Sequence, residues 1–176
     1  MAAGAAASLI AVPHVADTPR VALLVAAAIL IQLRLLANLI DGLVAIEGGR
    51  RTATGDLYNE IPDRVADVLI LVGAGYATTW LGWGDALGWA AATAAVLTAY
   101  VRVLGGSLGT TQHFVGPMAK PHRMAILTAA CLASVVEVAF DYTGKALTVA
   151  LCIIVAGSIL TVARRTWRTA GELRAR

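Results

Sequence analysis

Long apolar runs, separated by short polar segments, divide the chain. An eleven-residue stretch near the start, AAGAAASLIAV, is too short to cross a bilayer, and we interpret it as the end of a first helix whose start is shortened or missing. Five further runs reach about the 20 residues that a membrane-spanning helix needs. They cover approximately residues 20–46, 58–82, 85–105, 122–141 and 145–165. The pattern predicts an all-α, polytopic membrane bundle of about six transmembrane helices.

The composition supports this class. Hydrophobic residues make up 59% of the chain and charged residues 14%, whereas soluble domains are nearer one half and one quarter. At 176 residues we expect a single integral membrane domain over 1–176, without a separate soluble module. The net charge of +3 does not indicate a nucleic-acid partner, because the basic residues lie between apolar runs, where membrane topology explains them.

The basic residues also predict the orientation. Only Arg20 and Lys145 fall on one side of an up-and-down topology, and Arg34 and Arg64 fall inside runs. Because cytoplasmic loops are rich in Lys and Arg, the other side should face the cytoplasm, as in a bacterial inner membrane. The tail ARRTWRTAGELRAR then reads as an interfacial anchor. The residues on the basic side are Arg50, Arg51, Arg102, Lys120, Arg123, Arg164, Arg165, Arg168, Arg174 and Arg176.

Acidic residues concentrate where two of the runs meet on this side. Six of the 11 Asp and Glu residues fall between Asp41 and Asp67. In the run before the loop, Arg34, Asn38, Asp41 and Ala45 share one helical stripe by their spacing. With a rise of about 1.5 Å per residue, Asp41 lies roughly 9 Å below the membrane surface.

The run after the loop carries a matching stripe. Asn59, Asp63 and Asp67 are spaced by four residues, and Asp63 should lie at about the same depth as Asp41, facing it. Carboxylates inside a membrane need compensation. Basic partners could supply it, and the candidates are Arg34, Arg64 and Arg102.

A divalent cation is the other possible partner of these acids. Carboxylate and amide oxygens suit Mg²⁺ or Mn²⁺, and Mg²⁺ is often shared with substrate phosphates, which indicates a diphosphate substrate. Gly42 costs about 1 kcal/mol in a helix relative to Ala. With Ala45, it leaves space beside Asp41 for a flat nucleotide.

At these residues the sequence resembles the CDP-alcohol phosphatidyltransferase family. The family pattern is Asp, two residues, Asp-Gly, two residues, Ala-Arg, about eight residues, Gly, three residues, Asp, three residues, Asp. The spacing fits throughout, and the segment GPMAKPHRMA at 116–125 is also similar to a loop in one branch of the family. The matching positions in this chain are Asn38, Asp41, Gly42, Ala45, Ile46, Gly55, Asn59 and Asp63.

Three positions depart from that pattern. Asn38 and Asn59 stand where the family usually has Asp, and Ile46 stands where it has Arg. An Asn offers a carbonyl oxygen without negative charge, so metal binding should be weaker or involve fewer ions. Asp67, one turn beyond Asp63, is a further candidate ligand that would compensate.

The resemblance implies a specific activity. Such enzymes are six-helix membrane bundles, usually homodimers, that transfer a phosphatidyl group from a CDP-linked lipid to an acceptor alcohol in phospholipid biosynthesis and release CMP. By position, Asn38, Asp41, Asn59 and Asp63 would bind Mg²⁺ or Mn²⁺, and Asp63 would be the general base. Gly42, Ala45 and Gly55 would border the nucleotide. The acceptor stays open among glycerol 3-phosphate, an inositol phosphate, serine and other alcohols.

Several residues have simpler interpretations. Asn59 could be the N-cap of its helix, and Asp63 and Asp67 could be structural partners of Arg64 and Arg34. Lys120 and Arg123 could form a membrane-surface anchor or, alternatively, a phosphate site for the acceptor or the lipid headgroup. Two other functions also stay open: a catalytically silent relative acting as a membrane scaffold, and a small cation transporter lined by the intramembrane acids.

Overall fold

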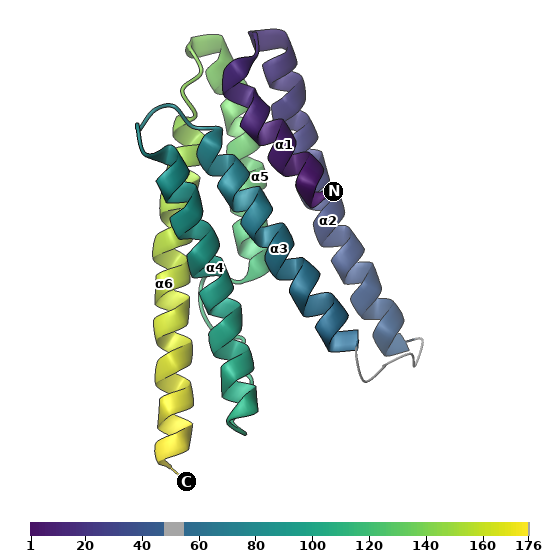
Figure 1. Ribbon diagram of the computed structural model, residues 1–176, viewed down its shortest axis with the longest axis vertical. Helices are drawn as coiled ribbons and strands as arrows, with labels where there is room; N and C mark the ends of the chain where they lie inside the picture. The colour runs from purple at the N-terminus through teal and green to yellow at the C-terminus, as the bar shows by residue number, and fades with distance from the viewer. Residues whose placement is uncertain (48–54, 176) are drawn as a thin grey trace.

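In the part of the chain that the structure describes, six α-helices form a bundle (Figure 1). The computed structural model describes the backbone of residues 1–47 and 55–175 and, within these ranges, the side chains of 1–41 and 57–175. The all-α prediction is confirmed. In chain order the elements are α1 Ala2–Ala11, the 3₁₀ turn η1 Val12–His14, α2 Asp17–Glu47, α3 Gly55–Tyr76, α4 Gly84–Ser107, α5 Lys120–Glu137, the 3₁₀ turn η2 Val138–Phe140, and α6 Lys145–Arg174.

Within the described residues, four helices are long and apolar enough to cross a membrane, which indicates an integral membrane protein. The prediction of five such spans is therefore confirmed for four. The exception is α3, whose first half carries Glu60, Asp63, Arg64 and Asp67. The short first helix was predicted correctly, as Ala2–His14 is apolar but brief. The four spans are Asp17–Asp41, Gly84–Ser107, Lys120–Phe140 and Lys145–Arg174.

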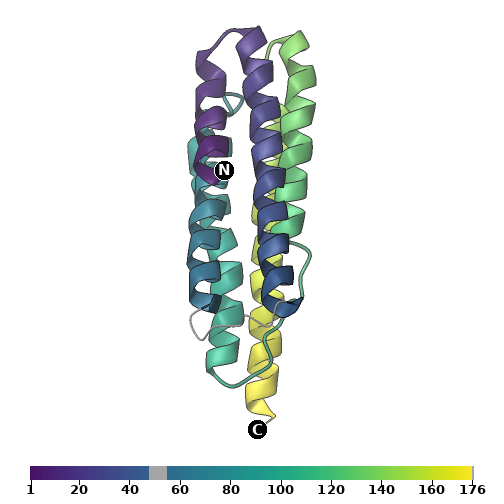
Figure 2. The ribbon, with the colours of Figure 1, turned by 90° about the vertical axis from the view of Figure 1, so that its right-hand side faces the viewer.

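The two ends of the bundle differ in chemistry. At one end, here called the basic end, α2, α4 and α6 finish and α3 and α5 begin (Figures 1 and 2). At the other, the aromatic end, lie the connections 77–83 and 138–144 and the exposed side chains of Trp80, Trp83 and Trp89. The sequence predicted α6 to end near 165, but the helix continues through the supposed anchor to Arg174.

Small residues allow the closest helix contact. A Cβ atom added to Gly88 of α4 would lie 2.8 Å from the Cα of Gly75 in α3 and 2.9 Å from the carbonyl oxygen of Leu71. Glycine at these positions therefore lets the two backbones touch. Elsewhere α1 packs against both α2 and α3, α2 packs against α5, and α4 against α6 (Figure 2).

Polar contacts close the aromatic end. The Glu137 carboxylate accepts hydrogen bonds from the backbone N–H groups of Lys145 (3.0 Å) and Ala146 (2.5 Å), so it satisfies donors at the start of α6. The Tyr142 hydroxyl donates to the Ala77 carbonyl at 2.6 Å. Burial, together with the nearby Glu137 carboxylate, raises the pKa of Tyr142, so this donor stays protonated at physiological pH.

Candidate functional site

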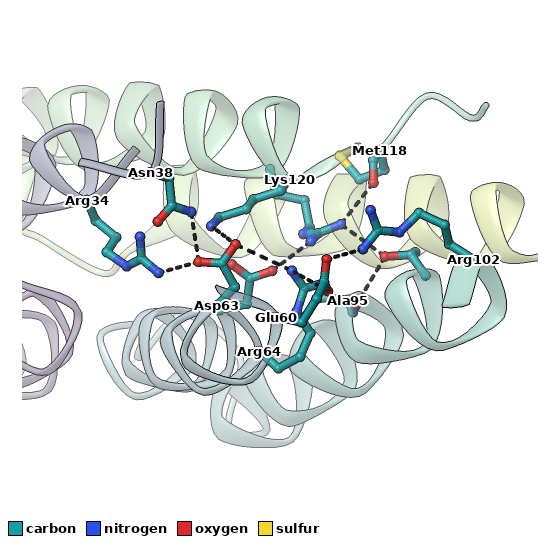
Figure 3. A network of polar contacts seen from close by, with 12 residues as sticks. Arg34, Asn38, Glu60, Asp63, Arg64, Ala95, Arg102, Met118 and Lys120 are labelled. Carbon is teal, nitrogen blue, oxygen red and sulfur yellow. Dashed lines mark hydrogen bonds and ion pairs between the residues drawn. The ribbon is translucent and has the colours of Figure 1, made fainter. Parts of the chain in front are cut away.

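Asp63 of α3 joins three helices near the basic end (Figure 3). Its Oδ1 accepts hydrogen bonds from the Arg34 guanidinium and, at 2.7 Å, from the Asn38 amide, both on α2. Its Oδ2 lies 2.7 Å from the Nζ of Lys120, the first residue of α5. The side chains of Arg34, Asp63 and Lys120 are between 15% and 18% exposed, so these charges meet largely out of solvent.

A second group of charges continues from Asp63 toward α4. Glu60, one turn earlier on α3, forms an ion pair with Arg102 of α4. The Arg64 guanidinium lies 3.7 Å from both the Glu60 and the Asp63 carboxylates. The guanidinium of Arg102 also stacks over the Phe114 ring, 5.0 Å from its centre.

These side chains surround a cavity of about 230 Å³ between α3, α4 and the start of α5, here called the basic pocket. Its walls include two acidic residues, Glu60 and Asp63, against a larger number of basic ones. An excess of positive charge around a small cavity favours an anionic guest. The basic side chains are Arg64, Arg102, Lys120, Arg123 and Arg165.

Behind this pocket lies a fully buried ion pair. Arg123 of α5 and Asp67 of α3 are each 1% exposed and meet at 2.7 Å. Arg123 also donates to the Met118 carbonyl at 2.9 Å and to the Thr98 hydroxyl at 3.3 Å. Arg123 is therefore a buried link between α5, α3 and α4 and not a surface anchor, and it also contributes to the lining of the basic pocket.

Sequence reasoning missed this link and the role of Arg165. Arg165 of α6 donates to the carbonyls of Thr98 (2.5 Å) and Val115 (3.0 Å), so it holds the segment before α5 in place. The one sequence signal was Thr98, a polar residue inside an apolar run. Asp67 and Arg123 are 56 residues apart, and no local pattern connects them.

A second cavity, here called the interhelical cavity, opens between α2 and α3, with a volume of about 580 Å³. Its polar lining residues include Arg34, Asn38, Asp41 and Asn59, and the rest of the lining comes from α2, from α3 and from the first two residues of the chain. Asp63 does not line this cavity, but its carboxylate accepts a hydrogen bond from Asn38, which does line the cavity. The two predicted stripes thus meet through Asn38 and Asp63 and not through Asp41 and Asp63.

The predicted metal ligands lie in two different environments, the interhelical cavity and the ion pairs around the basic pocket. Asp41, Asn38 and Asn59 share the interhelical cavity, whereas both oxygens of Asp63 face cations and Asp67 faces Arg123. Among the described residues, no group of three or more His, Cys, Asp or Glu side chains is close enough to hold an ion. One carboxylate and two amides suit Mg²⁺ only when substrate phosphates complete the coordination.

The remaining predicted residues fall as follows. The side chains of residues 42–47 and 55–56 lie outside the described part, so the predictions for Gly42, Ala45 and Gly55 have no structural account. The N-cap interpretation of Asn59 is wrong, because α3 begins at Gly55 and Asn59 lies in its second turn. The structural interpretation of Asp67 names the wrong partner, since Arg123 and not Arg34 pairs with it.

Comparison of the chain with protein-family models, with curated proteins and with solved structures gives no match. The likeness to the CDP-alcohol phosphatidyltransferases therefore rests on the residues quoted above.

Proposed function

We propose that this protein is a membrane enzyme that transfers a phosphatidyl group from a CDP-alcohol, such as CDP-diacylglycerol, to an acceptor alcohol and releases CMP. One observation carries the proposal. Asp63, the last position of the spaced pattern, lies where α2, α3 and α5 meet. It lines the basic pocket, and it accepts a hydrogen bond from Asn38, which lines the interhelical cavity. A carboxylate in this position therefore borders the basic pocket directly and is linked to the interhelical cavity through Asn38.

In this proposal Asp63 is the general base. A hydroxyl of the acceptor, held in the basic pocket, transfers its proton to Asp63 while its oxygen attacks the phosphatidyl phosphorus. The bond between that phosphorus and the CMP oxygen breaks, and CMP leaves with the electron pair. Arg34 and Lys120 hold Asp63 in the ionised form that can accept a proton. Because the same two cations occupy both carboxylate oxygens, the acceptor hydroxyl reaches Asp63 in this proposal when one of them turns toward substrate.

The donor substrate belongs, in the same proposal, on the interhelical cavity side. Asp41, Asn38 and Asn59 would hold Mg²⁺ or Mn²⁺ there, with the substrate diphosphate completing the coordination, and Gly42, Ala45 and Gly55 would border the nucleotide. The ion would offset the negative charge of the diphosphate and of the departing CMP. Asp67 is assigned a structural role, because Arg123 neutralises it in a buried position.

The basic pocket favours an acceptor that itself carries a phosphate. Besides Arg123, which pairs with Asp67, it has four basic side chains against two acidic ones and a volume of about 230 Å³, so it suits a small anion. Guanidinium groups bind phosphate oxygens in a bidentate manner. Among the acceptors left open by the sequence, glycerol 3-phosphate and an inositol phosphate fit this description better than serine.

Release of CMP tests the proposal. Purified protein receives CDP-diacylglycerol, Mg²⁺ or Mn²⁺ and, in turn, glycerol 3-phosphate, inositol phosphate and serine. We expect release with a phosphorylated acceptor and a loss of 10²- to 10⁴-fold in Asp63→Asn, as removal of a general base produces. Asp17→Asn serves as the matched control, because Asp17 is exposed and pairs with Arg20 far from the pocket. A parent protein that releases no CMP with any acceptor contradicts the proposal.

A second candidate, a catalytically silent relative that acts as a membrane scaffold, also has an observation in its favour. Two of the four pattern positions are amides, and the carboxylate of Asp63 is already paired with cations. In that case Asp63→Asn would equal the parent in the CMP assay, and Mg²⁺ would not change thermal stability. Cation transport has less support, since Glu60, Asp63 and Asp67 are all ion-paired.

A further inference from the structure

A groove at the basic end shares no lining residue with the basic pocket or the interhelical cavity. It has a volume of about 510 Å³ and runs between the last turns of α6 and the segment before α5. Its lining consists of Val115, Gly116, Arg164, Trp167, Arg168 and Gly171. The indole of Trp167 is 79% exposed, an unusual state for so large an apolar ring. The proposed transfer reaction does not use any of these residues.

The length of α6 places the groove at a defined depth. Its 30 residues span about 45 Å, but a bilayer's hydrocarbon core is only about 30 Å thick and uses roughly 20 of them. A crossing that starts at Lys145 therefore ends near Arg164 and Arg165. Arg164, Trp167 and Arg168 then lie at the level of the phospholipid headgroups, on the basic side of the membrane.

Two glycines contribute to the lining of the groove, Gly116 on the segment before α5 and Gly171 on α6. Gly116 has a φ of +124°, and a Cβ atom there would lie 2.5 Å from the Thr161 side chain. The Thr161 hydroxyl accepts a hydrogen bond from the Met118 backbone N–H at 3.0 Å, which holds the segment against α6. At the other side, a Cβ atom on Gly171 would meet nothing within 4 Å, so the groove is open there.

Within the described residues, the guanidinium groups in the groove have no carboxylate in contact. Glu172, one turn after Arg168, lies 2.9 Å from His113 and accepts a hydrogen bond from the Thr111 N–H. Arg164 and Arg168 are both exposed and lie one helical turn apart, where like charges repel. No carboxylate occurs among the described residues that line the groove, and in the described part of the chain neither guanidinium has an ion-pair partner. By contrast, Arg102, Lys120 and Arg123 are paired. An anion between the two arginines would remove the repulsion.

We propose that this groove binds the phosphate headgroup of an anionic phospholipid of the inner leaflet, such as phosphatidylglycerol. The two guanidinium groups bind the phosphate, and the Trp167 ring packs on the first part of the acyl chains. Basic pockets on the cytoplasmic side of membrane helices bind anionic headgroups in this way, and indole rings prefer the interfacial region. The proposal does not depend on the transferase function.

Quenching of tryptophan fluorescence by brominated lipids tests the proposal. The full-length protein is reconstituted into phosphatidylcholine vesicles that contain a small fraction of brominated phosphatidylglycerol or brominated phosphatidylcholine. The other three tryptophans, Trp80, Trp83 and Trp89, lie toward the aromatic end, so they report on the opposite leaflet. We expect stronger quenching by brominated phosphatidylglycerol, and Trp167→Phe should remove this difference.

Three variants distinguish lipid binding in the groove from attraction of anionic lipid to positive surface charge in general. Each guanidinium should contribute about fivefold to the affinity for phosphatidylglycerol. The double variant Arg164→Gln/Arg168→Gln should therefore abolish the preference for this lipid. Arg174→Gln removes an exposed arginine of the same helix end that does not line the groove, and should keep the preference. Gly171→Leu fills the groove but keeps both arginines, and it should reduce the preference for phosphatidylglycerol. Equal quenching by the two lipids in the parent, or an unchanged preference in the double variant or in Gly171→Leu, overturns the proposal.

Discussion

Ion pairs between side chains of different helices are the main polar feature of the described residues. Asp63, Glu60 and Asp67 on one helix each contact a basic residue of another. The solvent exposure of each pair determines how much it contributes to the stability of the fold. Glu60 is 37% exposed as a side chain, so solvent weakens its pairing, whereas Asp67 and Arg123 are shielded from water. Loss of one partner matters most in the shielded pair.

We expect Arg123→Met to destabilise the protein by about 3–5 kcal/mol, because it leaves the Asp67 carboxylate buried without a counter-charge. The double variant Asp67→Leu/Arg123→Met should recover most of that loss, since no buried charge remains. Unfolding in detergent, followed by circular dichroism, measures both. The control is Asp17→Asn, which removes an exposed carboxylate and should change stability by less than about 1 kcal/mol. A single variant as stable as this control would contradict the argument.

At the scale of elements, hydropathy predicted four of the long helices because each must present about 20 apolar residues to lipid. Hydropathy did not predict the end of α6, where tertiary contacts determine the structure. The last turns of α6 are polar, and they continue as a helix because Arg165 and Thr169 pack against neighbouring segments. For the site, helical spacing correctly brought the polar stripes of α2 and α3 together, but they meet through Asn38 and Asp63 and not through the predicted Asp41 and Asp63. The contacts of Lys120 and Arg123 with α3 depend on how α5 packs, which no local pattern contains.

The contact between α3 and α4 gives a prediction at this scale. In Gly88→Ala the new methyl group would lie 2.8 Å from the Gly75 backbone, so the two helices must separate. We expect a net loss of about 1–3 kcal/mol, although Ala alone favours a helix by about 1 kcal/mol. Gly171→Ala is the matched control, because it makes the same change on α6 with nothing within 4 Å, and it should be neutral or slightly stabilising. Thermal unfolding in detergent distinguishes the two; equal melting temperatures would argue against a tight contact.

For the whole molecule, the two ends of the bundle give the orientation. Exposed indoles gather around 80–89, and arginines gather near the end of α6. Because Lys and Arg are retained on the cytoplasmic side, the basic end, the proposed site and the lipid groove should all face the cytoplasm. This orientation is what the proposed reaction requires, since a CDP-linked donor and a phosphorylated acceptor are water-soluble at their reactive ends and are made inside the cell.

Cysteine accessibility tests this orientation in intact bacterial cells. Gly82 and Gly171 lie near opposite ends, both are exposed, and neither has an atom within 4 Å of an added Cβ, so Gly82→Cys and Gly171→Cys should leave the fold unchanged. The background is Cys152→Ser, because Cys152 is exposed whereas Cys131 is buried. A membrane-impermeant maleimide should label position 82 in intact cells and position 171 only after permeabilisation. The reverse pattern would place the site outside the cytoplasm, where CDP-linked substrates cannot reach it, and would contradict both the orientation and the proposed function.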